Sequence, residues 1–347
     1  MFPGGSLLPV LGLLVAVYTG LVLLRNRRLV RPPILGIDGA PLPERTFTLS
    51  DGETVDFVAV GPTDPAGADS APIAHPIFLV PGADGMKETF RYQVPALARH
   101  RKVVCATLRR KLTPEDTFDR MVDDVAEMAA ELLATNGSDR FVLLGQSLGG
   151  AIAMRFAVRY PERVAGLVLS NTLARISYDH VGLNRALLAP LAMSTTRYLP
   201  TGVTRLLARL WSRLEVWIYD ASPGSKRVID YALWTGPRTV RSSVSNARVA
   251  RLKKIDLLST LSSIQAPTLV LKGPRDHYVP PAWSHEIVAL VPGARYQEVT
   301  GTGHCSHLSM PASFNGLLLG WLESVVDENG EAPGPGAHPR PATEVGE

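Results

Sequence analysis

A serine at a sharp turn is the residue best placed in this chain to act as a nucleophile. An apolar, β-favouring run over 141–144 ends at Gly145, and an alanine-rich helical pattern begins directly after Gly149-Gly150. Ser147 stands between these glycines, at the apex of an expected strand, turn and helix. The glycines leave room where the two backbones crowd together, and such a turn pushes the serine hydroxyl into a cleft. The pattern Gly-x-Ser-x-Gly in this setting predicts nucleophilic catalysis by Ser147.

This strand, turn and helix resemble the nucleophile elbow of the α/β-hydrolase superfamily, in the serine hydrolase branch with a helical cap. The resemblance implies that Asp276, in the turn after an apolar strand at 266–272, is the acid of a Ser-His-Asp triad. It implies that His304 is the general base, because a Gly-x-Gly-His pattern follows the last expected strand at 295–300. An aspartate beside the imidazole would fix its tautomer and stabilise the imidazolium formed in the reaction.

Both assignments have alternatives among nearby residues. His307 lies three residues after His304, and His277 adjoins Asp276, so either is a rival for the base. The Gly-x-Gly-His pattern favours His304, and the other two are expected to be pocket or surface histidines. The alternative for Asp276 is a turn aspartate that makes only a local backbone hydrogen bond.

An oxyanion hole is expected where a continuous apolar strand over 76–80 ends in Pro81-Gly82. The resemblance implies that the backbone N–H groups of Ala83 and Leu148 would bind the oxyanion. Relatives usually have His-Gly in place of Pro81-Gly82, but the backbone donor does not depend on that histidine. An ordinary strand-ending turn is the alternative interpretation.

The elements that would position these residues indicate an α/β fold. Strand and helix patterns alternate between 76 and 172, which predicts a mostly parallel sheet with helices on both faces. We therefore expect an α/β-hydrolase core in two parts, 32–172 and 260–326. Prolines interrupt the helical pattern of 173–259, where the resemblance implies a cap over the nucleophile. The remaining 327–347, rich in Gly, Pro, Ala and Glu, is expected to be disordered.

The first 31 residues predict a membrane anchor. Residues 6–24 carry no charge and approach the ~20 residues that a helix needs to cross a bilayer. Four arginines follow between 25 and 31, so the positive-inside rule predicts a single-pass protein with its catalytic domain on the cytoplasmic side. A cleaved signal peptide is one alternative, although residues 1–5 lack the usual basic residue. A buried soluble helix is another, although no polar positions of helical period are present.

Positive charge is concentrated in the anchor and the cap. Residues 175–254 hold 14 Lys or Arg against 4 Asp or Glu, whereas the whole chain has a net charge of only +4. Such a cap, with Trp211, Trp217 and Trp234, could lie against an anionic membrane surface. The alternative is a solvated helical face with its aromatic residues in the pocket or core. No nucleic-acid-binding motif is present, so no nucleic acid partner is expected.

A second basic feature distinguishes the chain from common members of the family. After a strand at 102–108 they have Asp-x-Arg-Gly-x-Gly-x-Ser, but this chain has Arg109-Arg110-Lys111. These residues would either face the pocket and bind an anionic substrate or form a solvated loop. The two cysteines, Cys105 and Cys305, form neither a disulfide framework nor a metal site, and no metal or organic cofactor is expected.

Together these features predict a membrane-anchored serine hydrolase that cleaves a carboxylic ester, of carboxylesterase or lipase type. A hydrophobic or lipid-like substrate is inferred from the expected location alone, because a fold does not fix a substrate. Hydrolysis of carbon–carbon bonds and acyl transfer use the same triad and stay open. A catalytically silent binding protein is the second class, because Pro81-Gly82 and Arg109-Arg110-Lys111 also resemble maspardin-like relatives. The intact Ser147, Asp276 and His304 favour the enzyme.

Overall fold

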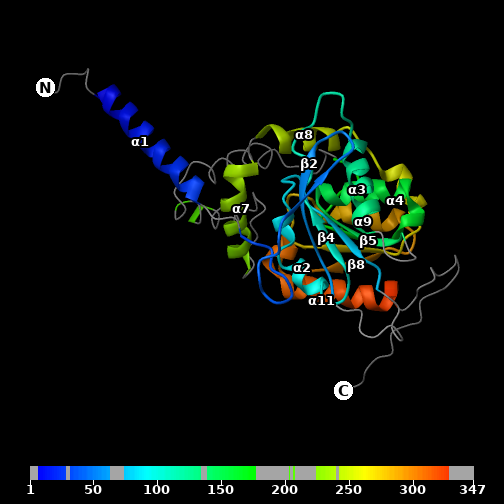
Figure 1. The fold of residues 1–347 in the computed structure, drawn as a ribbon. Helices are drawn as coiled ribbons and strands as arrows, with labels where there is room; N and C mark the ends of the chain where they lie inside the picture. Colours follow the sequence, from blue (N-terminus) through cyan, green and yellow to red (C-terminus); the bar gives the residue numbers. More distant parts are fainter. Residues whose placement is uncertain are drawn as a thin grey trace.

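An eight-stranded sheet forms the centre of the protein in a computed structural model (Figure 1). The structure describes residues 7–28, 32–62, 74–133, 139–176, 203, 206–207, 224–239 and 242–327. The strands lie in the order β1-β2-β4-β3-β5-β6-β7-β8; β2 is antiparallel to β1 and β4, and the other neighbours are parallel. They are β1 (Arg45–Thr48), β2 (Thr54–Val60), β3 (Ile77–Val80), β4 (Val103–Ala106), β5 (Phe141–Gln146), β6 (Val164–Ser170), β7 (Thr268–Lys272) and β8 (Arg295–Glu298).

The central strands are buried on both sides, as their continuous apolar sequences predict. Every residue of β3, β5 and β6 is buried, which is typical of parallel strands covered by helices on both faces of a sheet. The mostly parallel sheet and its two helical layers confirm the predicted fold class. The catalytic positions expected from the sequence all follow the carboxyl ends of parallel strands of this sheet, where open α/β sheets hold their ligands.

Two apolar cores lie against opposite faces of the sheet. One contains side chains of α3 (Asp119–Leu132), α4 (Leu148–Arg159) and α9 (Pro281–Leu290). The other contains side chains of α2 (Gln93–Leu97) and α11 (Pro311–Trp321), and Figure 1 shows the two groups of helices on different sides of the strands. Short helical turns complete the body: η1 (Lys87–Phe90), η2 (Pro161–Arg163), η3 (Leu258–Ser263), α10 (Ser306–Ser309) and η4 (Leu322–Asp327).

Two helices of the expected cap lie within the described residues, α7 (Ser225–Thr239) and α8 (Ser242–Leu252). Trp234 of α7 is buried in a small apolar cluster with Tyr231 and with Leu308 of α10. For this tryptophan, the structure therefore supports a place in a core over contact with a membrane. Trp211 and Trp217 lie outside the described residues, as does most of the expected cap between 177 and 223.

The amino-terminal segment forms a helix, α1 (Leu7–Arg28), which projects away from the body (Figure 1). Within the part of the chain that is described, no helix combines the length and the apolar character needed to cross a membrane. The anchor therefore stays a prediction, and the expected disordered tail lies outside the described residues from 328 onward. Large apolar side chains of α1 are nevertheless exposed: Val10, Leu11, Leu13, Leu14, Val15, Val17, Tyr18, Leu21 and Leu24.

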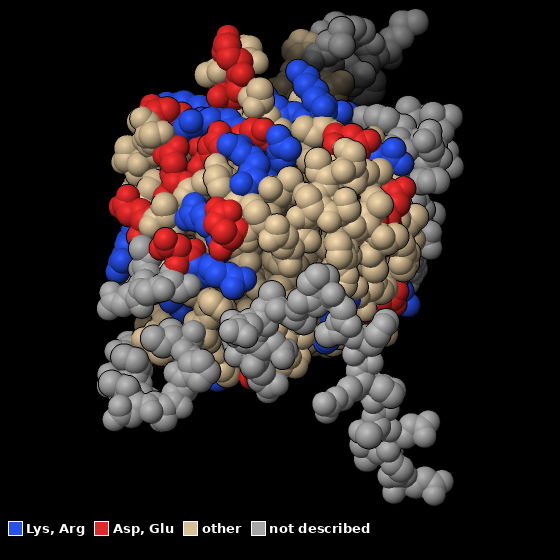
Figure 2. Space-filling view, turned by 90° about the vertical axis from the view of Figure 1, so that its right-hand side faces the viewer, with Lys and Arg blue, Asp and Glu red and all other residues tan. Residues whose placement is uncertain are grey.

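Acidic and basic side chains are interspersed on the face of the molecule shown in Figure 2. Ion pairs between α3 and α4 follow the same pattern, with Arg155 2.9 Å from Asp119 and Arg159 2.9 Å from Asp123. Partly exposed pairs of this kind contribute little stability individually, typically about 0–1 kcal/mol. The described residues of this face therefore present mixed charge.

Candidate active site

The turn between β5 and α4 holds Ser147 in a strained backbone conformation, with φ 54° and ψ −121°. Such a positive φ is uncommon for a residue with a side chain and persists only where the surrounding structure enforces it. A Cβ at Gly145 would lie within 3.0 Å of backbone atoms of Gly149, and a Cβ at Gly149 would overlap the Val80 carbonyl. Both glycines of the motif are therefore required by the close approach of strand and helix.

The structure brings the three predicted triad residues into one hydrogen-bonded chain. His304 Nε2 lies 3.1 Å from Ser147 Oγ, and His304 Nδ1 lies 3.0 Å from Asp276 Oδ2. All three side chains are largely buried, although they come from loops after three different strands. The arrangement gives the serine hydroxyl a general base and gives that base a carboxylate, which is the geometry of an activated nucleophile.

Asp276 is held by hydrogen bonds to both of its carboxylate oxygens. Oδ1 accepts from the backbone N–H groups of Tyr278 and Val279, at 3.0 and 2.9 Å. Asp276 therefore makes the local turn bonds of the alternative interpretation in addition to its contact with His304. Burial alone would raise the pKa of Asp276, but nearby His304 and Lys272 outweigh it and hold the pKa well below its usual range.

Two residues that contact Asp276 were not identified from the sequence. Lys272, the last residue of β7, donates to Asp276 Oδ2 at 2.6 Å. Asn171, directly after β6, donates to the same oxygen at 3.0 Å and to the Gly303 carbonyl at 2.9 Å. Asn171 has a φ of 47°, which asparagine tolerates better than most residues. A polar residue at the end of an apolar strand is the sequence signal that both share.

The rival His307 lies in a different environment from His304. It is fully buried, its Nε2 lies 2.7 Å from Thr89 Oγ1, and its ring packs against Phe90 and Phe314. Burial lowers the pKa of His307 to about 3, so this imidazole is neutral at physiological pH. The structure thus pairs His304 with Ser147 and places His307 in the packing behind it.

The turn after β3 passes directly beside the nucleophile. A Cβ at Gly82 would lie 3.3 Å from Ser147 Cβ, so Ala83 follows at the edge of the site. Leu148 is the first residue of α4, and the first N–H groups of a helix have no acceptor within it. The expected donors Ala83 and Leu148 therefore belong to segments that meet at Ser147.

Two residues of the expected cap contact this turn. The Arg248 guanidinium donates to the carbonyl of Ala83 at 3.0 Å and to the carbonyls of Leu108 and Arg109. Tyr231 donates to Asp84 Oδ2 at 2.7 Å. Burial lowers the pKa of Arg248 to about 10, so the guanidinium keeps its charge at neutral pH. Helices α7 and α8 are thereby tied to the segment expected to form the oxyanion hole.

The consecutive basic residues after β4 do not provide an anion site in the pocket. Arg109 is buried and contacts both carboxylate oxygens of Asp124, at 2.6 and 2.8 Å. Arg110 is exposed and pairs with Asp56 at 2.8 Å, while Lys111 is 86% exposed. The solvated-loop interpretation suits Arg110 and Lys111 but is wrong for Arg109, because its acidic partner is supplied by the distant helix α3.

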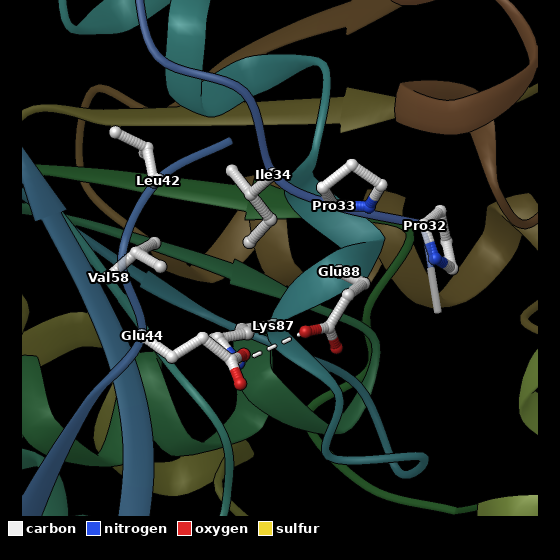
Figure 3. A pocket seen from close by; sticks show the side chains of 8 residues that line it. All are labelled: Pro32, Pro33, Ile34, Leu42, Glu44, Val58, Lys87 and Glu88. Carbon is white, nitrogen blue, oxygen red and sulfur yellow. Dashed lines mark hydrogen bonds and ion pairs between the residues drawn. The ribbon is translucent and has the colours of Figure 1, made fainter. Parts of the chain in front are cut away.

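A cavity lies apart from the triad, beneath the segment that follows α1 (Figure 3). This cavity of about 180 Å³ is lined in part by Pro32, Pro33 and the fully buried Lys87. The Lys87 ammonium pairs with Glu88 at 3.0 Å and with Glu44. Its lining includes neither the triad nor the expected oxyanion donors, and the Lys87 ammonium there is paired with two carboxylates.

The fold and site define a hydrolase, and comparison with known proteins identifies its family. Residues 77–317 match the model of the alpha/beta hydrolase family, which covers more than half of the chain. The protein therefore belongs to the alpha/beta hydrolase family, as the resemblance of its motifs predicted.

Individual relatives are similar at a lower level. RutD of Shigella flexneri serotype X, which bears the name of a carbamate hydrolase, is 26% identical over 272 residues, covering 72% of this chain and 92% of RutD. The polyketide synthase ThaQ of Burkholderia thailandensis is 29% identical over 257 residues, and the match spans 72% of this chain but only 12% of ThaQ. A hydrolase structure from Pseudomonas aeruginosa superimposes with a TM-score of 0.59 at 24% identity, covering 81% of this chain and 98% of that one.

Proposed function

We propose that this protein is a serine hydrolase that cleaves carboxylic esters through an acyl-enzyme. The observation that carries the proposal is the chain of contacts from Ser147 Oγ through His304 to Asp276, at 3.1 and 3.0 Å. A serine hydroxyl has little nucleophilicity at neutral pH unless a base takes its proton. Here the base is already within hydrogen-bonding distance and is oriented by a carboxylate.

The proposed reaction assigns one step to each group. His304 Nε2 takes the proton as Ser147 Oγ attacks the ester carbonyl, and Asp276 stabilises the imidazolium. The N–H groups of Ala83 and Leu148 bind the oxyanion of the tetrahedral intermediate. His304 then gives its proton to the departing alcohol, and water releases the acid by the same steps in reverse order. No metal or organic cofactor takes part in this sequence.

We propose further that the substrate is hydrophobic or lipid-like and that α1 holds the enzyme at a membrane. The support is the uncharged segment 6–24, the apolar side chains exposed along α1, and the arginines that follow. The arginines favour a single-pass arrangement with the catalytic domain on the cytoplasmic side. Removing 1–31 should move the protein from the membrane fraction to the soluble fraction; an unchanged distribution would contradict the anchor.

Carbamate hydrolysis is the second candidate function, because the similarity to RutD extends over 92% of that protein. A carbamate presents a carbonyl to the same nucleophile and oxyanion donors, and only the leaving group and its environment differ. The names of relatives therefore do not decide between an ester and a carbamate, and direct rate measurements are needed.

The test is a matched substrate panel with the purified full-length chain in detergent. Nitrophenyl esters of increasing acyl length are compared with N-alkyl carbamates of the same lengths and the same leaving group. We expect the largest kcat/KM for esters of longer chains, and its loss in Ser147→Ala. His285→Ala, which changes an exposed histidine of α9, is the control for His304→Ala. A preference for carbamates would support the second candidate, while no turnover of either class would favour a silent binding protein.

A further inference from the structure

A fully buried lysine lies beside the acid of the triad. Lys272 has 0% of its surface exposed, and its ammonium donates to Asp276 Oδ2 at 2.6 Å and to the Val279 carbonyl. An ammonium is costly to bury unless it is paired and hydrogen-bonded. The two acceptors satisfy that requirement, so the pairing with Asp276 accounts for the presence of a charged group at the end of β7.

The lysine and the histidine share one carboxylate oxygen. Asp276 Oδ2 accepts from Lys272 at 2.6 Å and from His304 Nδ1 at 3.0 Å. The ammonium and the imidazole are therefore no more than about 6 Å apart, a separation at which unit charges interact strongly inside a protein. The carboxylate that should stabilise the imidazolium is thus already partly neutralised in the resting enzyme.

We propose that Lys272 is a positioning residue that keeps Asp276 ionised and lowers the proton affinity of His304. This inference rests on the serine hydrolase function proposed above and adds a control of the base at that site. A nearby cation disfavours protonation of the imidazole, so His304 remains a neutral base to lower pH than it would beside an unpaired carboxylate. The consequence is an enzyme that retains activity under mildly acidic conditions.

The other groups around His304 do not supply a competing charge. His307, from α10, is neutral because burial lowers its pKa to about 3. The Tyr278 ring lies edge-on to His304 with ring centroids 5.1 Å apart, and its phenol is neutral at physiological pH because a tyrosine hydroxyl ordinarily ionises near pH 10. Asn171 and Gln146 are uncharged amides. More distant cations act on these neighbours: Lys253 on Tyr278, and Arg91 on His307.

The test measures how the rate of fluorophosphonate labelling of Ser147 depends on pH, in the full-length chain and in two variants. Lys272→Met removes the charge and the donor, while Lys272→Gln removes the charge but keeps a donor. Circular dichroism and thermal unfolding establish that each variant is folded. Labelling needs a neutral His304, so the acid limb of the profile reports the proton affinity of that residue.

We expect both variants to shift the acid limb upward by about one pH unit, which is a tenfold change in the protonation equilibrium of His304. If the acid limb does not shift in folded variants, the inference is overturned. It is also overturned if Lys272→Met lowers the labelling rate equally at every pH and Lys272→Gln restores that rate. If neither variant folds, a parent limb above pH 7 overturns it. An unlabelled parent at every pH would instead refute the proposed function.

Discussion

Alanine at Gly149 should disrupt the nucleophile turn more than it stabilises the helix that follows. The added Cβ would lie within 3.0 Å of the carbonyl oxygens of both Val80 and Pro81, and neither is a side chain that can turn aside. Overpacking costs about 1–3 kcal/mol, and two backbone obstacles place this site near the upper end. Alanine in a helix returns roughly 1 kcal/mol relative to glycine. The net loss in the free energy of unfolding is therefore about 2 kcal/mol.

The matched control is Gly316→Ala, because Gly316 lies in α11 and a Cβ there meets nothing within 4 Å. That variant should be more stable than the parent by about 0.5–1 kcal/mol. Urea unfolding monitored by circular dichroism measures both changes. Gly149→Ala should also label at least tenfold more slowly, because displacing the Pro81 carbonyl would move the turn through Gly82 that carries Ala83. Equal stability of Gly149→Ala and the parent, with equal labelling, would refute the steric argument.

Three further predictions concern the cap, the acid and the buried histidine. Arg248→Met should lower kcat at least tenfold with a smaller change in KM, because the Ala83 carbonyl loses its hydrogen-bond donor. The control Lys226→Met, at an exposed position, should change neither constant. Similar losses of kcat in both variants would contradict a specific role of Arg248. Asp276→Asn should reduce kcat/KM by about three to four orders of magnitude in a folded protein, since an amide cannot stabilise the imidazolium; a loss below tenfold would argue against its role. The pKa of His307 falls from 6.5 to about 3 on folding. The stability gained by burying the neutral imidazole is therefore fully present above pH 6.5 and is lost as pH falls toward 3. His307→Gln should flatten the pH dependence of unfolding free energy across that window, and an unchanged slope would show that other groups cause it.

Local patterns were sufficient to predict the fold class and the nucleophile candidate Ser147, and the family resemblance placed the candidates Asp276 and His304. Ser147 is marked by its own neighbours, since the glycines around it are required wherever a strand and helix cross so closely. Asp276 follows a strand whose apolar run is visible in the sequence, whereas His304 follows the polar strand β8 and is marked by the Gly-x-Gly-His pattern. Such signals are short-range, so they survive without knowledge of the tertiary structure.

The partners of these residues depend on contacts that no local pattern contains. Asn171 would pass for an ordinary polar residue after a strand, because its contact with Asp276, 105 residues away in the sequence, is made only in the folded protein. Arg109 is similar, because its burial depends on pairing with Asp124 of helix α3. A charged side chain can be buried only together with a partner of opposite charge, so the sequence around one of the two residues does not reveal its burial.

The measurement that tests the central claim most directly is mass spectrometry of the full-length protein after reaction with a fluorophosphonate. We expect one adduct, on Ser147, in the parent and in His285→Ala. We expect no adduct in Ser147→Ala and strongly slowed labelling in His304→Ala, because the hydroxyl then lacks its base. An unlabelled, folded parent, or labelling that persists at the parental rate without His304, would contradict an activated serine at this site.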